Sequence, residues 1–215
     1  MKSKERLPGT DDHGSSKDRV AWQATREAET ISDTEHLKKI ELLLKKKISK
    51  KDLRSLIFII SWIIHNTGNA HAKEVYLSIP WEDADDYTMM NLIDGAIRAD
   101  LIEYIDRVRQ MIKKTESGSD HYSSAIEYFG KIGKLDALHD IGSELDADCS
   151  GHFEPFICCT ELARIGSTDA IPYLERAIER HQKGRKQWQK QTIAWSTRAI
   201  ERIQNNEDPA TPWWN

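Results

Sequence analysis

The sequence predicts an all-α protein in which short antiparallel helix pairs stack in a row as a right-handed solenoid. About five pairs are expected, followed by a closing helix at the C-terminus. Apolar residues recur at helical spacing along the chain, and similar apolar offsets surround a series of turn positions. Those positions are 32, 68, 100, 133, 166 and 204, which gives intervals of 36, 32, 33, 33 and 38 residues. A recurring interval of this size is typical of stacked helix pairs.

The clearest copy of the repeat spans residues 162–178. One apolar stripe ends at Ile165, and Gly166 suits the left-handed conformation that closes a helix. Asp169 falls at the next helix start, where the helix dipole favours an anion. Pro172 lies in the first turn, where its missing N–H costs little. The second apolar stripe is formed by Ala170, Ile171, Leu174, Ala177 and Ile178.

This segment resembles a HEAT-type repeat, whose second helix opens with Gly-x-x-x-Ala-(Val/Ile)-Pro-x-Leu. The matching residues are Gly166, Ala170, Ile171, Pro172 and Leu174. The other copies are degraded, and the Thr-Pro-Leu-His signature of ankyrin repeats is absent. The resemblance implies a HEAT-like α-α superhelix in which the second helix of each pair lines the concave side.

One solenoid domain is expected over residues 17–215, preceded by a disordered tail over residues 1–16, which lack periodicity. The longest apolar run, residues 56–64, is too short to span a membrane. No signal peptide is visible after Met1, and three cysteines, two of them adjacent, argue against a disulfide framework. These features predict a cytoplasmic protein with no membrane contact, and they leave its oligomeric state open.

The sequence shows no motif for catalysis or for a cofactor. Glycine-rich phosphate loops and the His-Glu-x-x-His pattern are absent, and no histidine lies beside a plausible nucleophile and acid. Cys149, His152, Cys158 and Cys159 lie close together, but their spacing is not a standard zinc-ligand spacing. The last two cysteines occupy offsets that are apolar in neighbouring copies, so they are expected in the core. We therefore expect no catalytic residue, no metal and no cofactor.

Charge is distributed unevenly along the chain. Residues 55–182 contain 11 basic and 22 acidic side chains, a net charge of −11. Residues 1–54 carry a net charge of +4 and residues 183–215 a net charge of +3. An acidic groove repels phosphate backbones and attracts basic proteins, so the middle of the chain favours a basic protein partner.

The second helices of the solenoid would present offsets three, seven and ten after each turn to this groove. Acidic residues hold offset three in four of five copies, although the preference of helix starts for carboxylates would also explain this. Tyr76, Trp81 and Tyr173 are candidate aromatic anchors, with packing inside the fold as the alternative for Trp81. The expected partner-binding residues are Glu74, Tyr76, Trp81, Glu103, Asp106, Arg107, Asp136, Asp140, Asp169, Tyr173 and Arg176.

These features favour a non-enzymatic protein that binds a basic protein partner. One specific form is an immunity protein that neutralises a bacterial toxin of the nuclease type, by analogy with small acidic toxin inhibitors. A general scaffold fits the same residues.

The alternative is a HEAT-like nucleic-acid-binding protein or a DNA glycosylase of the alkylpurine type. The lysine-rich segments 45–51 and 183–190 would then contact phosphates, although the groove carboxylates argue against it. A HEAT-like lyase of the phycobilin kind shares only the architecture. Trp213 and Trp214 would either cap the stack or bind a partner.

Overall fold

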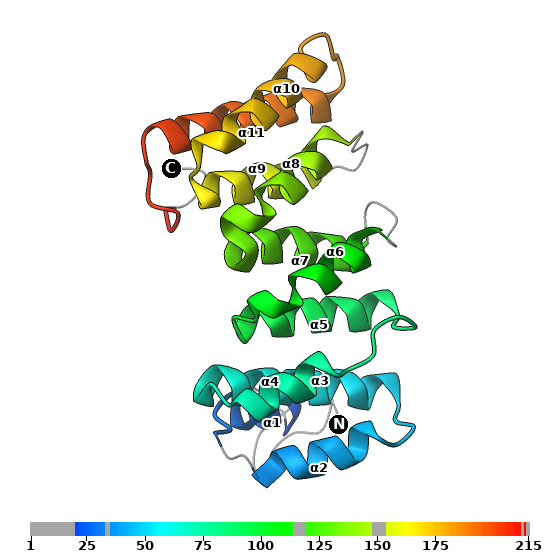
Figure 1. The fold of residues 1–215 in the computed structure, drawn as a ribbon. Helices are drawn as coiled ribbons and strands as arrows, with labels where there is room; N and C mark the ends of the chain where they lie inside the picture. Colours follow the sequence, from blue (N-terminus) through cyan, green and yellow to red (C-terminus); the bar gives the residue numbers. More distant parts are fainter. Residues whose placement is uncertain (1–19, 33–34, 114–118, 148–153, 212, 214–215) are drawn as a thin grey trace, which may run out of the picture. The chain divides into compact units, whose positions relative to one another are not determined.

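The computed structural model describes residues 20–32, 35–113, 119–147, 154–211 and 213. Every regular element among them is a helix, which confirms the all-α fold (Figure 1). The chain divides into two compact units, Met1–Asp83 and Ala84–Asn215. The tail predicted over residues 1–16 lies outside the described residues. The single domain over residues 17–215 and the HEAT-like superhelix stay predictions.

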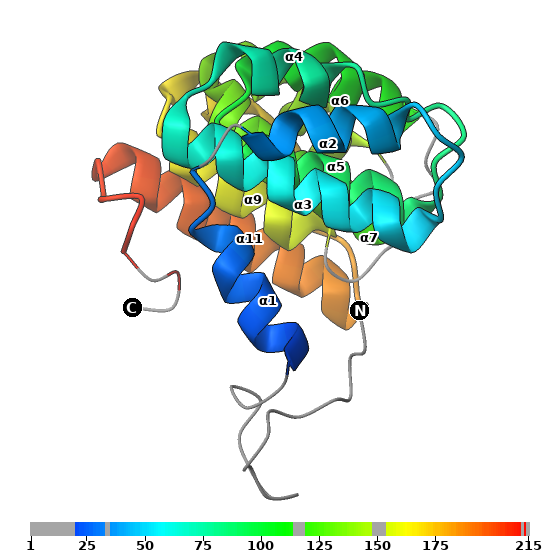
Figure 2. The ribbon, with the colours of Figure 1, turned by 90° about the horizontal axis from the view of Figure 1, so that it is seen from below.

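The first unit is organised around one long helix. It contains α1 (Val20–Glu29), α2 (Glu35–Leu44), α3 (Lys50–Thr67) and α4 (Ala70–Leu77). Helix α3 packs against the other three, with α1 on the opposite side from α4 (Figure 2). Ser49 begins α3 by accepting a hydrogen bond from the Asp52 N–H, and Gly68 ends it with a φ of 64°. The core side chains of α3, each at most 2% exposed, are Ile57, Ile60, Ile63 and Ile64.

In the second unit, short segments of 3-10 or π geometry join the two helices of each pair. Its elements are α5 (Asp86–Arg98), η2 (Ile102–Tyr104), α6 (Ile105–Lys113), α7 (Asp120–Tyr128), η3 (Phe129–Gly133), η4 (Lys134–Ala137), α8 (Leu138–Asp146), α9 (Glu154–Ile165), η5 (Thr168–Ala170), α10 (Ile171–His181) and α11 (Gln187–Gln204). Helix α7 packs between α5 and α9, α9 packs on α11, and α8 packs on α9 and α10. The first helices of the pairs therefore form one layer of this unit, and α6, α8 and α10 form another (Figures 1 and 2).

Left-handed backbone recurs where the sequence predicts turns. Gly68, Asp100 and Gly166 have φ values of 64°, 51° and 71° at predicted turn positions. Lys134 and Asn206, with φ values of 48° and 49°, lie one and two residues beyond the predicted positions 133 and 204. Gly133 itself has a φ of −68° and belongs to the π-helical turn η3. Positive φ values therefore occur at or close to these predicted turns. At the turn between α7 and α8 the residue with positive φ lies one position later, because η3 extends the end of α7.

The core of the second unit is rich in aromatic side chains. Tyr104, Tyr128 and Phe129 are fully buried. The Tyr128 hydroxyl donates a hydrogen bond to the carbonyl of Leu101, and burial raises the pKa of this phenol. Cys158 and Cys159 are also fully buried, which confirms the core prediction for them.

The predicted cysteine cluster is only partly described, because Cys149 and His152 lie outside the described residues. Within the described residues, no group of three His, Cys, Asp or Glu side chains is arranged to hold a metal ion. No described helix combines the length and hydropathy needed to cross a membrane.

The segment after α11 folds back onto its own unit. The ring of Trp213 lies 5.8 Å from the ring of Phe156, and the Arg202 guanidinium lies 5.3 Å from the Trp213 ring centroid. Arg202 also donates hydrogen bonds to the carbonyls of Asp208 and Thr211. Trp213 therefore packs against α9 and α11, whereas Trp214 lies outside the described residues.

Candidate functional site

Among the residues predicted to bind a partner in the first unit, only Glu74 is exposed. Its carboxylate lies 3.5 Å from Nδ1 of His71, and Nε2 of the same ring contacts Glu41. Hydrogen bonding to Glu41 and then to Glu74 raises the pKa of His71. Tyr76 is 0% exposed and Trp81 is 5% exposed. Both rings lie in the core, so neither ring is accessible to a partner. For Trp81, the structure agrees with the alternative interpretation, in which its ring packs inside the fold.

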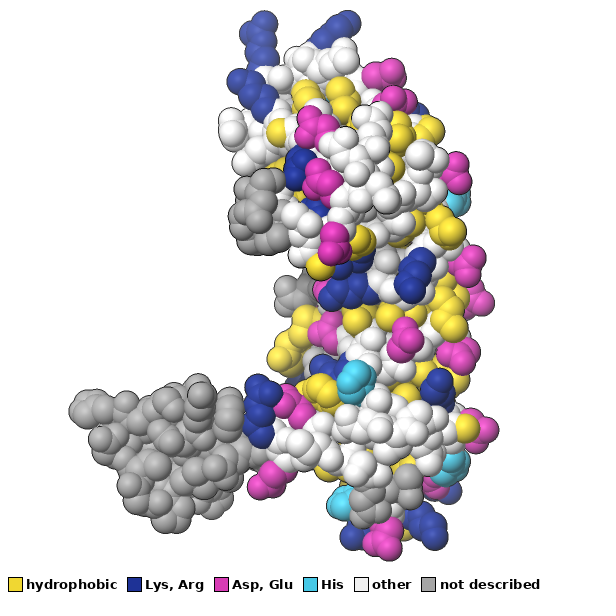
Figure 3. All heavy atoms as spheres, turned by 90° about the vertical axis from the view of Figure 1, so that its left-hand side faces the viewer, with side chains coloured by type: hydrophobic (Ala, Val, Ile, Leu, Met, Phe, Trp, Pro, Cys, Tyr) yellow, Lys and Arg dark blue, Asp and Glu magenta, His cyan; other side chains and the backbone are white. Residues whose placement is uncertain are grey.

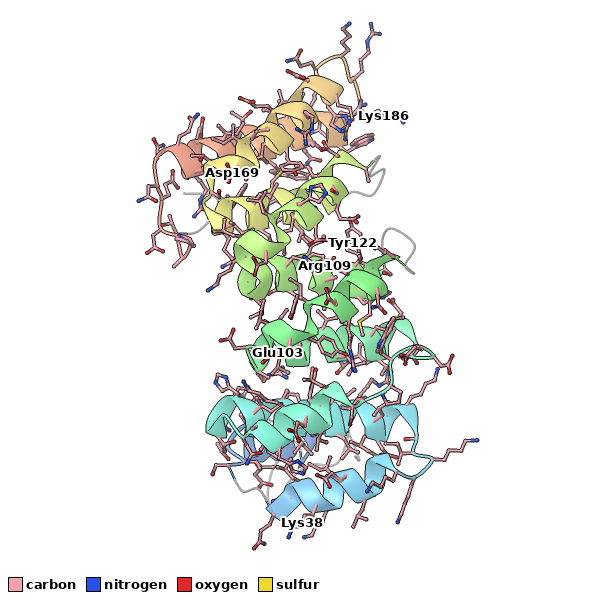
Figure 4. All side chains as sticks on the ribbon, viewed as in Figure 1. Lys38, Glu103, Arg109, Tyr122, Asp169 and Lys186 are labelled. Carbon is pink, nitrogen blue, oxygen red and sulfur yellow. The ribbon has the colours of Figure 1, made fainter. Side chains whose placement is uncertain are left out.

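Three predicted carboxylates occupy equivalent positions in the second unit. Glu103 lies in η2, Asp136 in η4 and Asp169 in η5, at intervals of 33 residues. Each is exposed and forms no ion pair with another described residue. Figure 4 shows Glu103 and Asp169 at the starts of the segments that lead into α6 and α10. We call these three residues the carboxylate row.

Arg109, which the sequence analysis missed, links two helix pairs. From α6, its Nε and Nη2 donate hydrogen bonds of 3.0 and 2.9 Å to Oδ2 of Asp140 on α8. Nη2 also donates to the backbone carbonyl of Asp136 at 2.9 Å, and Nη1 lies 3.0 Å from Asp106. The Asp140 side chain is 26% exposed and that of Asp106 is 78% exposed. Asp140 is therefore a structural link, while Asp106 keeps most of its surface for solvent or a partner.

A second set of contacts joins α8 to α10. Arg176 approaches Asp146 at 2.6 Å, and Arg180 approaches the same carboxylate at 3.1 Å. The Tyr173 hydroxyl lies 2.8 Å from Nδ1 of His139, and the Arg176 guanidinium lies 4.5 Å from the Tyr173 ring centroid. Tyr173 and Arg176 are therefore held between two helices and are only partly available to a partner.

Gly142 makes the approach of Tyr173 to α8 possible. A Cβ atom at Gly142 would lie 2.4 Å from Cδ1 of the Tyr173 ring. The remaining predicted residue, Arg107, is half-buried with its guanidinium 5.5 Å from the Tyr104 ring centroid. The structure thus brings the predicted residues of this unit onto one layer, but it uses several of them for packing.

The first helices carry another row of charges that the sequence analysis did not identify. In the second unit, a cation lies two residues before each of the turn positions 100, 133, 166 and 204, and an acid precedes that cation by three or four residues in three cases. The cations are Arg98, Lys131, Arg164 and Arg202, and the acids are Asp94, Glu127 and Glu161. A basic residue that recurs at one offset before the turn is the sequence signal that would have revealed this row.

Glu161 is the most unusual member of this row. Its side chain is 5% exposed, and burial raises its pKa to about 7, against an opposing effect of Arg164. Arg164 Nε donates to Glu161 Oε2 at 2.8 Å, while Glu127 and Lys131 form their own ion pair nearby. Gly130 lies directly against the carboxylate, because an added Cβ would be 2.1 Å from Oε2. Burial also raises the pKa of Asp94.

A cleft of about 840 Å³ opens beside the turn between α7 and α8. Figure 3 looks onto the side of the molecule where these turns lie, and basic, acidic and hydrophobic side chains are intermingled there. We call this cleft the π-turn cleft, and its side chains include Ile102, Lys131, Lys134, Leu135, Asp136 and Arg164.

The described part of the protein is thus all-helical, and in the second unit ion pairs connect neighbouring helix pairs. Comparison with protein-family models, with curated proteins and with solved structures gave no match.

Proposed function

We propose that the protein is a non-enzymatic binding protein and that its carboxylate row receives a basic protein partner. The observation that carries this proposal is the regular placement of Glu103, Asp136 and Asp169, one for each helix pair of the second unit and each exposed. Asp106 adds a further exposed carboxylate on α6. The preference of helix starts for anions explains the residue type but leaves these charges unpaired among the described residues.

The spacing of the row limits the shape of the partner. Packed helices lie ~10 Å apart, so successive carboxylates of the row are expected at about that distance or at a small multiple of it. An extended chain advances ~10 Å in about three residues, and an α-helix does so in about seven. The partner is therefore expected to present lysine or arginine side chains at one of these intervals.

The charge of the central region supports a basic partner over an acidic one. Residues 55–182 carry a net charge of −11, which accelerates the approach of a positively charged protein. The surface open to a partner is narrower than the sequence predicts, because two of the expected contact residues are engaged within the fold: Asp140 binds Arg109 and Arg176 binds Asp146. A partner would therefore contact the carboxylate row and Asp106.

An immunity protein that neutralises a nuclease-type toxin is the specific form of this proposal. Such a toxin is basic because it binds nucleic acid, and the carboxylate row would compete for the same cations. A scaffold that holds a basic protein uses the same contacts, and the identity of the partner distinguishes the two.

Nucleic-acid binding is the second candidate, favoured by two exposed clusters of cations. Lys45, Lys46, Lys47, Lys50 and Lys51 are exposed in the first unit, and Lys183, Arg185, Lys186 and Lys190 are exposed in the second. Either cluster would contact phosphates through charge alone. The carboxylate row opposes this role, since it would repel a nucleic-acid backbone.

The experiment compares affinity purifications from cells of the source organism, followed by mass spectrometry. The baits are the wild type, a row variant with Glu103→Lys, Asp136→Lys and Asp169→Lys, and a control with Glu27→Lys, Asp83→Lys and Glu175→Lys. The control removes three exposed carboxylates elsewhere and changes the net charge equally. Asp140 is left intact because a lysine there would face Arg109.

We expect a basic protein that the wild type and the control retain and that the row variant loses. Circular dichroism should show equal helix content in all three proteins, because the substituted side chains are exposed. Recovery of nucleic acid alone, or a protein held equally well by the row variant, would contradict the proposed function.

A further inference from the structure

The π-turn cleft is a second surface with different chemistry from the carboxylate row, and the two share only Asp136. Three cations line it: Lys131, Lys134 and Arg164. Lys134 is exposed and forms no ion pair with another described residue. The cleft therefore has at least one cation available to an incoming anion.

Arg164 is the second available cation. Its own partner is the buried carboxylate of Glu161, and burial raises the pKa of Glu161 to about 7. Near neutral pH this carboxyl group is therefore protonated for much of the time, which weakens its hold on Arg164. The Arg164 side chain is 34% exposed, so it can also contact a ligand in the cleft. Glu127 and Lys131 are the other charged groups that act on Glu161.

The backbone conformation at Lys134, which lines the cleft, is strained. Its φ of 48° and ψ of −127° belong to a region that side chains with a Cβ rarely adopt and that glycine adopts readily. It directly follows the π-helical turn η3, and π-turns recur at functional sites. A lysine at such a position is held there by the surrounding structure, at a conformational cost that glycine would avoid.

Two exposed aliphatic side chains flank these cations. Leu135 is 65% exposed and Ile102 is 41% exposed, and both line the cleft. They are two of the five large hydrophobic side chains exposed among the described residues. Single exposed leucines are ordinary, but two that border one cleft offer a contact for an apolar group.

We propose that the π-turn cleft binds an acidic peptide segment that carries aliphatic side chains. Carboxylates of the segment contact Lys134 and Arg164, and an aliphatic side chain packs between Leu135 and Ile102. A peptide fits better than a nucleic acid because none of the described residues that line the cleft is aromatic and could stack on a base. The segment is opposite in charge to the partner of the carboxylate row, so this site does not depend on the proposed function.

Fluorescence anisotropy of the full chain with a defined probe tests the site. The probe is a short fluorescein-labelled peptide of alternating glutamate and leucine. The comparison probes are a peptide with lysine in place of glutamate and a short single-stranded oligonucleotide. We expect the glutamate–leucine peptide to bind at least about tenfold more tightly than either comparison probe, since only it satisfies both the cations and the aliphatic pair.

Two charge-reversal variants locate the contact. Lys134→Glu should weaken binding of the acidic peptide about tenfold, because it replaces an attraction with a repulsion. Lys190→Glu is the matched control, since Lys190 is exposed on α11 and does not line the cleft, and it should leave the affinity unchanged. Equal effects of the two variants, or stronger binding of the oligonucleotide, would overturn the proposal.

Lys134→Gly separates a binding role from a purely structural one. Glycine relaxes the backbone at φ 48°, so the denaturation midpoint should rise, whereas loss of the cation should weaken peptide binding about fivefold. A variant that is more stable and binds the peptide as tightly as the wild type would show that Lys134 does not contact the ligand, and the assignment would fail.

Discussion

On α6 and α10, arginine side chains reach across to the neighbouring helix pair, whereas Lys131 in η3 and Arg164 on α9 each pair with an acid within one turn of the same stretch of chain. Arg109 binds Asp140 on the next pair, and Arg176 does the same for Asp146. In the other layer, Lys131 pairs with Glu127 four residues earlier, and Arg164 pairs with Glu161 three residues earlier.

The difference shows that ion pairs have different structural roles in the two layers of one unit. Contacts between pairs hold neighbouring helices in register, and they remove carboxylates from the surface that a partner would meet. Contacts within a helix do not position a neighbouring helix, so their contribution to stability depends on how deeply the charged groups are buried. Glu161 is the extreme case, because it is buried against Gly130 and its charge is poorly solvated.

The largest expected effect is the pH dependence of stability contributed by Glu161. Its pKa is about 7 in the folded protein, against an ordinary value of 4.5, so the folded state binds the proton more tightly than the unfolded state. The wild type therefore loses stability as the pH rises from about 4.5 through about 7, by an amount on the order of 3 kcal/mol from this group. Glu161→Gln cannot ionise and should not show this loss.

Urea denaturation of the wild type and Glu161→Gln at about pH 4.5 and about pH 8 measures this effect. The difference in unfolding free energy should shift in favour of the variant by about 3 kcal/mol at the higher pH. If the unfolding free energies of the two proteins changed by the same amount between these two pH values, Glu161 would not be a buried acid with a raised pKa.

The second largest expected effect is the loss of stability caused by Gly130→Ala. The added Cβ would lie 2.1 Å from Oε2 and 2.6 Å from Cβ of Glu161, so the buried side chain must move. Overpacking of this kind costs about 1–3 kcal/mol, measured as a lower denaturation midpoint. The same substitution at Gly68 meets nothing within 4 Å and strains only a φ of 64°, so about 1 kcal/mol is expected there.

A double variant sharpens this test. In a Glu161→Gly background, which removes both the carboxylate and the Cβ atom of residue 161, the space beside Gly130 is open, so Gly130→Ala should have a much smaller effect. Equal losses in both backgrounds would place the clash elsewhere.

The smallest effects compare the ion pairs of the two layers directly. The coupling energy between Arg109 and Asp140 should be about 1–2 kcal/mol, because the contact is partly buried and uses two guanidinium nitrogens. The coupling between Lys131 and Glu127 should be about 0.3–0.5 kcal/mol, as for other exposed pairs one helix turn apart. Double-mutant cycles on unfolding free energy measure both, and a reversed order would refute the distinction between the layers.

The positions of helices and turns were predictable because their causes are local. Apolar residues at helical spacing define the buried faces, and Gly166 takes the left-handed φ of 71° that ends α9. Pro172 lies in the first turn of α10, as its missing N–H requires. The π-turn at Phe129–Gly133 was not predicted, because the widening of the helix end depends on packing around Gly130 and Gly133.

The carboxylates of the candidate site were visible in the sequence, but their roles were not. Asp136 and Asp140 are four residues apart, yet only Asp140 accepts hydrogen bonds from Arg109 through its side chain. Tyr76 and Trp81 are aromatic residue types that often anchor a partner at a surface, but both are buried.

By itself, the sequence determined the helical pairs, their turns and the acidic character of the middle of the chain, since these follow from residues close together along the backbone. Only the tertiary structure decided which charges are paired, which aromatic rings are buried and that Glu161 lies where its pKa rises. Ion pairing and desolvation depend on the distance between atoms of residues about one repeat apart, and that distance is fixed only when the helices pack.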